Sequence, residues 1–461
     1  MTANDVTEVK IPSVFAGKPV VGIKKAAFKC NASIQKVFIP DSVTTIEGDA
    51  FAECVALKSV SFSKSVTKIG SYAFAFCKSL EEVRLPDSVD EMGKGVFYAC
   101  KALKKVKLPE GIKDIKEKMF QNCVSLERIE LPDSVVKLGG GQGGVFEGCK
   151  NLKEVKLSDK IKRLHDLTFG ECKSLTEIVI PDSVTKIDNA FEKCGKLHQL
   201  NLPKNLQTIE GAFWGCSFKE LKIPKSVTQI GSDCFSFFLG AKGLECISVE
   251  EGNKIYKSDG NCLIRIKDNA LILGSAKSII PNYVTSIGDS AFAAATNLKS
   301  IVIPEAVKSI GRYAFGGCAK LTAIAISENV SEIAEGAFRS CTALKEIVVA
   351  KKNKKFKSDG NCLIKIANNE LIAGCKESVL PSYVKIIGES AFMGISGLTS
   401  IVIPAGVKKI GDRAFMGCKN LAKVVMKDNI ETGIYAFGDT KWGKQTISLS
   451  KPQKRPKSAE R

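Results

Sequence analysis

Apolar and polar residues alternate in short stretches that recur along the chain, and the stretch beginning at Leu80 shows the pattern. Its order is Leu80-x-x-Val83-x-Leu85-Pro86. An apolar residue at every second position predicts a strand with one buried face. Because Pro86 has no backbone donor, we expect the strand to end before it. The segment also matches L-x-x-L-x-L, the strand signature of leucine-rich repeats.

The second half of the repeat follows this strand. Another short extended piece is expected around Val89, and Phe97, Cys100 and Leu103 then follow at intervals of three residues. That spacing predicts a helical turn with three side chains on one face. About six apolar side chains per repeat would point inward, each contributing roughly 1.5–3 kcal/mol when fully buried. Stacked neighbours must supply the rest of the stability.

A phenylalanine marks the interval at which the pattern recurs. The first five are each 23 residues apart, and most later steps are 22 or 23: Phe28, Phe51, Phe74, Phe97, Phe120, Phe146, Phe169, Phe191, Phe213, Phe235, Phe292, Phe315, Phe338, Phe392, Phe415 and Phe437. Repeats of this length that each contain a strand predict a solenoid. We therefore predict a leucine-rich-repeat solenoid, a β-rich α/β fold with short strands and a helical turn in each repeat.

Two steps in the series are longer, at 57 and 54 residues. Both contain Lys-Ser-Asp-Gly-Asn-Cys-Leu-Ile, at Lys257–Ile264 and Lys357–Ile364, so a block of about 100 residues is duplicated. Cys262–Ile266 and Ala270–Leu273 are apolar stretches joined by a polar turn, which predicts a β-hairpin in each insertion. A structural spacer is the favoured role for these hairpins, and ligand contact is the alternative.

These features divide the chain. We predict N-terminal repeats (1–235), a first hairpin insertion with a return to repeats (236–291), C-terminal repeats (292–449) that contain the second insertion (339–391), and a basic tail (450–461). The polar, proline-containing tail is expected to be disordered. Gly139–Gly144 lengthens one repeat, and since no Lys-Ser/Thr follows it, we interpret it as a surface loop and not as a phosphate-binding loop.

The cysteines follow the repeat. Eleven of the 17 lie three residues after the phenylalanine: Cys54, Cys77, Cys100, Cys123, Cys149, Cys172, Cys194, Cys216, Cys318, Cys341 and Cys418. A fixed position beside the core indicates free thiols that pack as small apolar side chains. There is no Cys-x-x-Cys motif, and neither His165 nor His198 has a metal-ligand spacing. We therefore predict no metal site, no cofactor and no enzyme activity.

Charge adds a second possibility. The chain has 68 Lys and Arg against 49 Asp and Glu, a formal net charge of +19. Such an excess attracts nucleic acid, anionic lipid, acidic glycans or acidic proteins, but it also serves solubility alone, and both interpretations remain open. No apolar run is long enough for a membrane span. The first residues show no basic segment followed by an apolar one, which predicts an intracellular protein.

A ligand is expected on the strands, which line the concave face of this architecture. Residues beside the central strand residue point outward there. In the N-terminal half these are charged: Glu82, Arg84, Lys105, Lys107, Arg128, Glu130, Glu154 and Lys156. Later repeats have an apolar residue at the second position: Val179, Val302, Ala325, Val348, Val402 and Val425.

Stacking about 4.8 Å apart would make these apolar residues an exposed stripe, and such a patch marks an interaction surface. The alternative is that valine simply favours strands. The candidate site residues for a protein or peptide partner are Val302, Ala325, Val348, Val402 and Val425. Those for steering the partner or binding an anionic ligand are Arg84, Lys105, Lys107, Arg128 and Lys156.

The repeat also resembles a known family. Ile180-Pro-Asp-Ser-Val-Thr-Lys-Ile187, followed by Ala190-Phe191 and Cys194, is similar to the BspA-like leucine-rich repeat, as are the other repeats across roughly residues 6–449. The resemblance implies a solenoid without catalytic residues. Many members of the family are surface proteins implicated in adhesion, extracellular-matrix binding or cell aggregation, so the resemblance implies a location at the cell surface.

The sequence thus predicts a non-enzymatic protein-binding scaffold that acts in adhesion or another protein–protein interaction. The alternative is binding of a glycan or nucleic acid through the basic surface. The location stays open, because the first residues and the resemblance point to different compartments.

Overall fold

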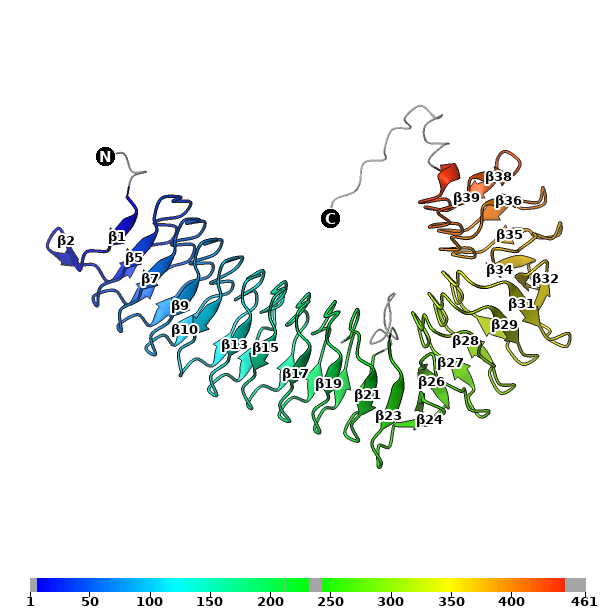
Figure 1. The fold of residues 1–461 in the computed structure, drawn as a ribbon, viewed down its shortest axis with the longest axis horizontal. Coiled ribbons are helices and arrows are strands. Elements are labelled where there is room, and N and C mark those ends of the chain that lie inside the picture. Colours follow the sequence, from blue (N-terminus) through cyan, green and yellow to red (C-terminus); the bar gives the residue numbers. More distant parts are fainter. Residues whose placement is uncertain (1–5, 212, 232–242, 444–461) are drawn as a thin grey trace. The chain divides into compact units, whose positions relative to one another are not determined.

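The computed structural model describes residues 6–211, 213–231 and 243–443, so the predicted basic tail at 450–461 lies outside the described residues. The chain is a leucine-rich-repeat solenoid of about 17 turns with a spacing of about 23 residues. It has two compact units: a first unit of Met1–Leu244 with Ser248–Ile255, and a second unit of Glu245–Ile247 with Tyr256–Arg461. Within each unit the turns follow one another in sequence order (Figure 1).

Most turns contribute a strand to a parallel ladder, which we call the long-strand ladder. The central residue of such a strand is buried or half-buried between more exposed residues, as alternation predicts; Val83 is a buried example. Strands β9 and β11 pair in register with an offset of 23 residues. In the first unit these strands are β1 (Glu8–Lys10), β5 (Lys36–Phe38), β7 (Ser59–Ser61), β9 (Glu82–Arg84), β11 (Lys105–Lys107), β13 (Arg128–Glu130), β15 (Glu154–Lys156), β17 (Glu177–Val179), β19 (Gln199–Asn201) and β21 (Glu220–Ile223). In the second unit they are β29 (Ala323–Ile326), β31 (Glu346–Val349), β36 (Ser400–Val402) and β38 (Lys423–Val425), and β23 (Cys246–Val249) is divided between the units.

A second parallel ladder consists of two-residue strands, most of them with one buried residue, and we call it the short-strand ladder. In the first unit it contains β4 (Gly22–Ile23), β6 (Thr45–Ile46), β8 (Lys68–Ile69), β10 (Glu91–Met92), β12 (Asp114–Ile115), β14 (Lys137–Leu138), β16 (Arg163–Leu164), β18 (Lys186–Ile187), β20 (Thr208–Ile209) and β22 (Gln229–Ile230). In the second unit it contains β27 (Ser286–Ile287), β28 (Ser309–Ile310), β30 (Glu332–Ile333), β35 (Ile386–Ile387), β37 (Lys409–Ile410) and β39 (Glu431–Thr432). The extended piece expected after each proline is thereby confirmed.

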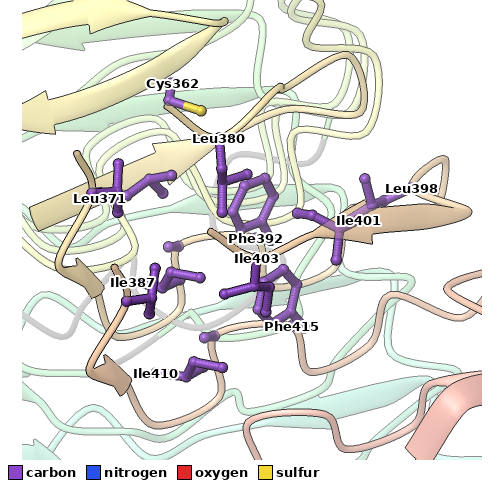
Figure 2. Packing of buried hydrophobic residues seen from close by; sticks show 14 of the residues in the cluster. Cys362, Leu371, Leu380, Ile387, Phe392, Leu398, Ile401, Ile403, Ile410 and Phe415 are labelled. Carbon is purple, nitrogen blue, oxygen red and sulfur yellow. The ribbon is translucent and has the colours of Figure 1, made fainter. Parts of the chain in front are cut away.

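The repeated phenylalanines close the core between the two ladders. Twelve of them are fully buried, and rings of successive turns stack face to face, such as Phe97 on Phe120 with centroids 5.8 Å apart and planes 6° apart. In the second unit, Phe392 and Phe415 stack in the same way beside Ile387 and Ile410 of the short strands (Figure 2). The core therefore runs along each unit as a column of aromatic rings.

The helical turn predicted at the phenylalanine is wrong. These segments are chains of turns, and helix occurs in the described residues only at 441–443. Gly95 and Ala99, two residues on either side of Phe97, have φ values of 60° and 56°. An α-helix cannot include left-handed residues at such intervals. Left-handed and right-handed residues alternate in this segment, and this alternation points every second amide toward the next turn. The Phe97 amide, for example, donates to the Met119 carbonyl at 3.1 Å.

The two insertions are three-stranded antiparallel sheets. In the first, β24 (Tyr256–Asp259) pairs with β25 (Cys262–Arg265), which pairs with β26 (Ala270–Leu273). In the second, β32 (Phe356–Asp359), β33 (Cys362–Lys365) and β34 (Glu370–Gly374) repeat that order. The predicted hairpins are confirmed as β25–β26 and β33–β34, and β24 and β32 add a strand that we did not predict. Each sheet continues into the short-strand ladder through β27 or β35.

One further hairpin, β2 (Val14–Phe15) with β3 (Lys18–Pro19), lies near the start of the first unit. None of the helical structure within residues 6–211, 213–231 and 243–443 is both long and apolar enough to cross a membrane.

Candidate functional site

The long-strand ladder positions nine of the ten predicted site residues, and Val302 holds the same repeat position in a segment without an assigned strand. Strand alternation turns the central residue inward, so the flanking residues must face solvent. Each of the ten is exposed: Arg84, Lys105, Lys107, Arg128, Lys156, Val302, Ala325, Val348, Val402 and Val425. The structure separates them by unit, with the basic residues in the first and the apolar ones in the second.

In the first unit the basic candidates are paired with acids of the same ladder. Arg84 contacts Glu82 on its own strand, with Nε 2.8 Å from Oε1. Arg128 reaches Glu154 on the next strand, with Nη2 2.9 Å from Oε2. These exposed pairs add little stability, but they neutralise the guanidinium groups that an anionic ligand would need.

Lysines of the same ladder behave in the same way, with one exception. Lys156 donates a hydrogen bond to Glu130, and this bond raises the pKa of the amine. Lys107 lies 4.0 Å from Glu110. Among the side chains that the structure describes, Lys105 alone of the five basic candidates has no acid within ion-pairing distance. The first-unit ladder is therefore largely charge-compensated.

Lys105 and Arg128 come together at a hollow of about 680 Å³. It lies between β11 and β13, which belong to different two-stranded sheets. Glu127 and Glu130 also line the hollow, and they put acids among its bases.

In the second unit the apolar candidates occupy one exposed repeat position, and we call this set of residues the apolar stripe. Ala325 pairs with Val348, and Val402 pairs with Val425, in the parallel register. Val302 is 80% exposed, although its segment is not assigned as a strand. Burial of apolar side chains is the main driving force for association, and this row presents several of them on one surface.

The stripe is longer than we predicted. Ile279 and Val379 are 76% and 73% exposed and lie one step of 23 residues before Val302 and Val402. The insertions that precede them hid their repeat position, but counting back 23 residues would have found them. The stripe thus consists of Ile279, Val302, Ala325, Val348, Val379, Val402 and Val425.

The surface beside the stripe is partly free of large or charged groups. At the first outward position of the same turns stand the small residues Ser300, Ala323 and Ser400, and the charged residues Lys277, Glu346, Glu377 and Lys423. In the first unit this position is charged in most turns. The exposed Val179, with 82% of its surface accessible, is by contrast isolated among polar and charged neighbours.

A polar hollow that we did not predict lies in the first unit, beside the residues that directly follow the short strands β16, β18 and β20. It measures about 510 Å³ and is lined by His165, Asp188 and Glu210 from successive turns, with Gly140 and Gly141 of the glycine-rich loop on one side. The glycine-rich loop is thus part of the wall of a surface hollow.

The polar side chains of this hollow hold one another. Arg163 donates to Asp188 with Nε 2.6 Å from Oδ2, and Lys186 reaches Asp188 at 3.5 Å and Glu210 at 3.0 Å. Burial, together with the charge of Arg163, lowers the pKa of His165. The described residues that line the hollow include no serine, threonine, cysteine or tyrosine, so no side-chain hydroxyl or thiol lines it beside His165.

The sequence did contain a signal for this cluster. The residue after the short strand is glycine in many turns: Gly70, Gly93, Gly139, Gly231, Gly288, Gly311, Gly388, Gly411 and Gly433. At Gly70, an added Cβ would lie 2.3 Å from the backbone of the preceding turn. Three successive turns instead have His165, Asp188 and Glu210, and such a run of exceptions marks a local change in structure.

The remaining histidine and the repeat cysteines lie outside these hollows. His198 is exposed just before β19. Each of the eleven repeat cysteines is buried and unbridged, and its Sγ donates to the carbonyl of the phenylalanine one turn earlier, as Cys100 does to Phe74 at 3.1 Å. In the described part of the chain, no group of three or more His, Cys, Asp and Glu is placed to hold a metal ion.

The repeat of this chain has counterparts in known proteins. The sequence profile of the BspA type leucine rich repeat region matches in six copies, over residues 21–141, 142–239, 265–368 and 370–451. No curated protein sequence matches the chain.

Solved structures of leucine-rich repeat proteins are similar to the chain. One from Bacteroides ovatus is 25% identical, with a TM-score of 0.50, and the match covers 94% of this chain and 93% of that one. A leucine-rich cell surface protein from Faecalibacterium prausnitzii is 24% identical, with a TM-score of 0.34 and coverages of 93% and 91%. A leucine-rich repeat protein from T. pallidum is 30% identical over 41% of this chain and 78% of that one, with a TM-score of 0.34.

Proposed function

Because this chain belongs to the BspA-type leucine-rich repeat family, we propose that it is a non-enzymatic scaffold that binds a protein partner through the apolar stripe of its second unit. Attachment to that partner, as in adhesion, is the form of activity that we propose. The scaffold would act by presenting a fixed surface, and no chemical step is required of it.

The observation that carries this proposal is the contrast between the two units at one repeat position. The position is occupied by charged and compensated residues in much of the first unit, and by exposed Val, Ile or Ala in the second. If valine were there only because strands favour it, the first unit would have it in more turns than that of Val179. Contiguous exposed apolar surface is typical of a protein-binding site.

The test compares binding by the wild type with binding by the double variant Val348→Asp/Val402→Asp. Both side chains are exposed, so the variant should fold with an unchanged melting temperature. A charge in the stripe would have to be desolvated when a partner binds, and we expect the affinity for a protein recovered with the wild type to fall at least about tenfold.

The matched control is Val179→Asp/Asn201→Asp, which adds the same two negative charges at the same repeat position outside the stripe. A partner retained by this control and lost by the double variant supports the proposal. Partners that bind both variants as tightly as the wild type would show that the stripe is not the binding surface.

A further inference from the structure

The two insertions share one buried framework. Asn353 is 6% exposed, and its Nδ2 donates to the carbonyls of Ser327 and Val330 at 2.8 and 2.9 Å. Asn253, 100 residues earlier, donates in the same way to Pro224 and Val227. The loop that follows β31 is therefore fixed at its centre.

A tyrosine holds the other end of each loop. Tyr383 donates to Asp359 at 2.8 Å, and the Lys357 ammonium lies 3.8 Å from the centre of the Tyr383 ring. Tyr283, Asp259 and Lys257 make the same contacts in the first insertion, at 2.7 and 4.0 Å. A shared framework makes the differences at the surface easy to identify.

Those differences are in charge. Residues 350–368 contain six lysines and one aspartate, whereas residues 250–268 contain four basic and four acidic residues. Glu251, Gly252 and Ile255 of the first insertion correspond to Lys351, Lys352 and Lys355 of the second. The six lysines, which we call the lysine cluster, are Lys351, Lys352, Lys354, Lys355, Lys357 and Lys365.

No acid compensates the lysine cluster. Lys351, Lys352, Lys354 and Lys355 are exposed, and in residues 6–211, 213–231 and 243–443 no carboxylate lies within ion-pairing distance of any of the six. Asn353 fixes the backbone between them, since its Oδ1 accepts from the Lys355 amide at 2.8 Å. Four ammonium groups are thus displayed on a loop whose centre is held from within the core.

The hairpin strand next to the loop adds to the contrast. In the first insertion Arg265 is neutralised by Asp268, with Nη2 2.6 Å from Oδ2. In the second insertion the corresponding residues are Lys365 and Asn368. Glu370 stands opposite Lys365 in the β33–β34 pairing, but among the described side chains its carboxylate accepts from Asn368 and forms no ion pair with Lys365. The amide of Ile366 donates to the Lys355 carbonyl at 2.9 Å, which brings Lys365 to the edge of the same loop.

We propose that the lysine cluster is a binding site for an anionic polysaccharide, a sulfated glycan. This inference does not depend on the apolar stripe. Lysine ammonium groups are point charges that suit dispersed sulfates and carboxylates. Single-stranded nucleic acid is instead held by bases stacked on aromatic rings and by arginine. Here Phe356 is buried, the Tyr383 ring is covered by Lys357, and the cluster contains no arginine. The second insertion therefore has a role beyond that of a spacer.

The experiment measures the affinity of the full chain for a short heparin oligosaccharide by titration at low and physiological salt. The variant Lys351→Glu/Lys352→Gly/Lys355→Ile installs the residues of the first insertion, which the same framework already accommodates. We expect its affinity to fall about tenfold or more, and the wild-type affinity to fall as salt rises because the contacts are electrostatic.

The matched control is Lys101→Glu/Lys113→Glu in the first unit, which removes the same net charge from two exposed lysines. Retention of binding in this control and loss in the cluster variant support the site. Equal loss in both would show that net charge alone attracts the glycan, and an unchanged affinity of the cluster variant would place the glycan elsewhere; either result overturns the proposal.

Two further measurements keep the test decisive. If the cluster variant loses its cooperative melt, Lys351→Gln/Lys352→Gln/Lys354→Gln replaces it, because these side chains are exposed and glutamine keeps their length. Oligothymidylate is titrated under the same conditions. Tighter binding to oligothymidylate than to the heparin oligosaccharide would identify the cluster as a nucleic-acid site and reject the glycan.

Discussion

At the scale of single residues, the repeated cysteine does more than fill space. Its position beside the phenylalanine predicted a small buried side chain, and burial is confirmed. The structure adds that each thiol donates to a phenylalanine carbonyl one turn away, at 3.0 Å for Cys194 and Phe169. A second donor on that carbonyl could not be predicted, because it depends on which turns are neighbours in space.

The repeated phenylalanine should dominate the stability of its turn. Phe97 is fully buried and stacks on Phe74 and Phe120. We expect Phe97→Ala to lower the free energy of unfolding by about 3–5 kcal/mol, because the cavity cannot close between two fixed rings. Urea denaturation followed by circular dichroism measures this. A loss below about 1 kcal/mol would contradict the core position.

The buried thiols should make the protein sensitive to alkali. Burial raises the pKa of Cys149 and of Cys194 to about 12, from an ordinary value of 9.0. Between these two pH values the folded chain keeps protons that the unfolded chain releases. Stability is therefore complete below pH 9 and falls as the pH rises through this window, by about 1.4 kcal/mol per pH unit for each such thiol.

Urea midpoints measured at pH 8, 9.5 and 10.5 test this dependence. Lysines and tyrosines also titrate there, so the comparison is with a Cys149→Ala/Cys172→Ala variant, which has two fewer raised thiols. Its stability should decline less steeply with pH. Identical slopes for the two proteins would assign the alkaline loss to other groups.

At the scale of elements, the insertions depend on one asparagine each. Replacing Asn353 by alanine removes two bonds to carbonyls and leaves the Lys355 and Phe356 amides without their acceptor. Unsatisfied buried groups cost about 1–3 kcal/mol each, so we expect a loss of about 3 kcal/mol in the stability of the second unit. Hydrogen exchange of β31 and β32 should accelerate, and an unchanged rate would show that the loop is held by other contacts.

The strands of the fold could be predicted, and the turns between them could not. Alternation at Val83 and the stop at Pro86 describe β9 as it is found. The three-residue interval from Phe97 to Cys100 is also the interval between side chains on one face of a helix. In the structure a left-handed residue, Ala99, places the two side chains at this interval without forming a helix. Because a non-glycine residue with positive φ is uncommon, nothing in the local sequence announced it.

The site was predictable where it follows the repeat. Val302, Val348 and Val402 were found because each stands at a fixed offset from its phenylalanine, and the structure exposes them. The lysine cluster was not singled out, because its meaning depends on which acids are close by. Sequence position alone does not show that Arg265 is neutralised by Asp268 while Lys365 forms no ion pair within the described residues.

At the scale of the whole molecule, stability is distributed along the chain and not gathered in one centre. Each turn contacts its neighbours, so a defect should weaken those neighbours and leave distant turns intact. We expect Phe415→Ala to accelerate hydrogen exchange in the turns of Phe392 and Phe437, which stack on it at 5.0 Å. The first unit should be unaffected, and accelerated exchange throughout the chain would show that both units unfold together.

Exposed ion pairs occur along much of the solenoid. Many join adjacent turns, as Lys153 does with Glu127 at 2.8 Å, but pairs so open to water contribute little. Raising the salt concentration should therefore change the melting temperature only slightly while it weakens binding at the lysine cluster. A melt and a titration in the same salt series separate the two effects.

The contact between each cysteine and the phenylalanine of the preceding turn has a consequence for inheritance. Cys77, Cys100 and Cys123 each make that contact at the same 26-residue offset. The contacts between one interior turn and the next are therefore equivalent along this part of the chain. Unequal crossing-over between two such stretches of a gene would add or delete a whole turn. The turns brought together would make the same cysteine–phenylalanine contact as before. We expect genes related to this one to differ in length by steps of one turn, with reading frame and core both preserved.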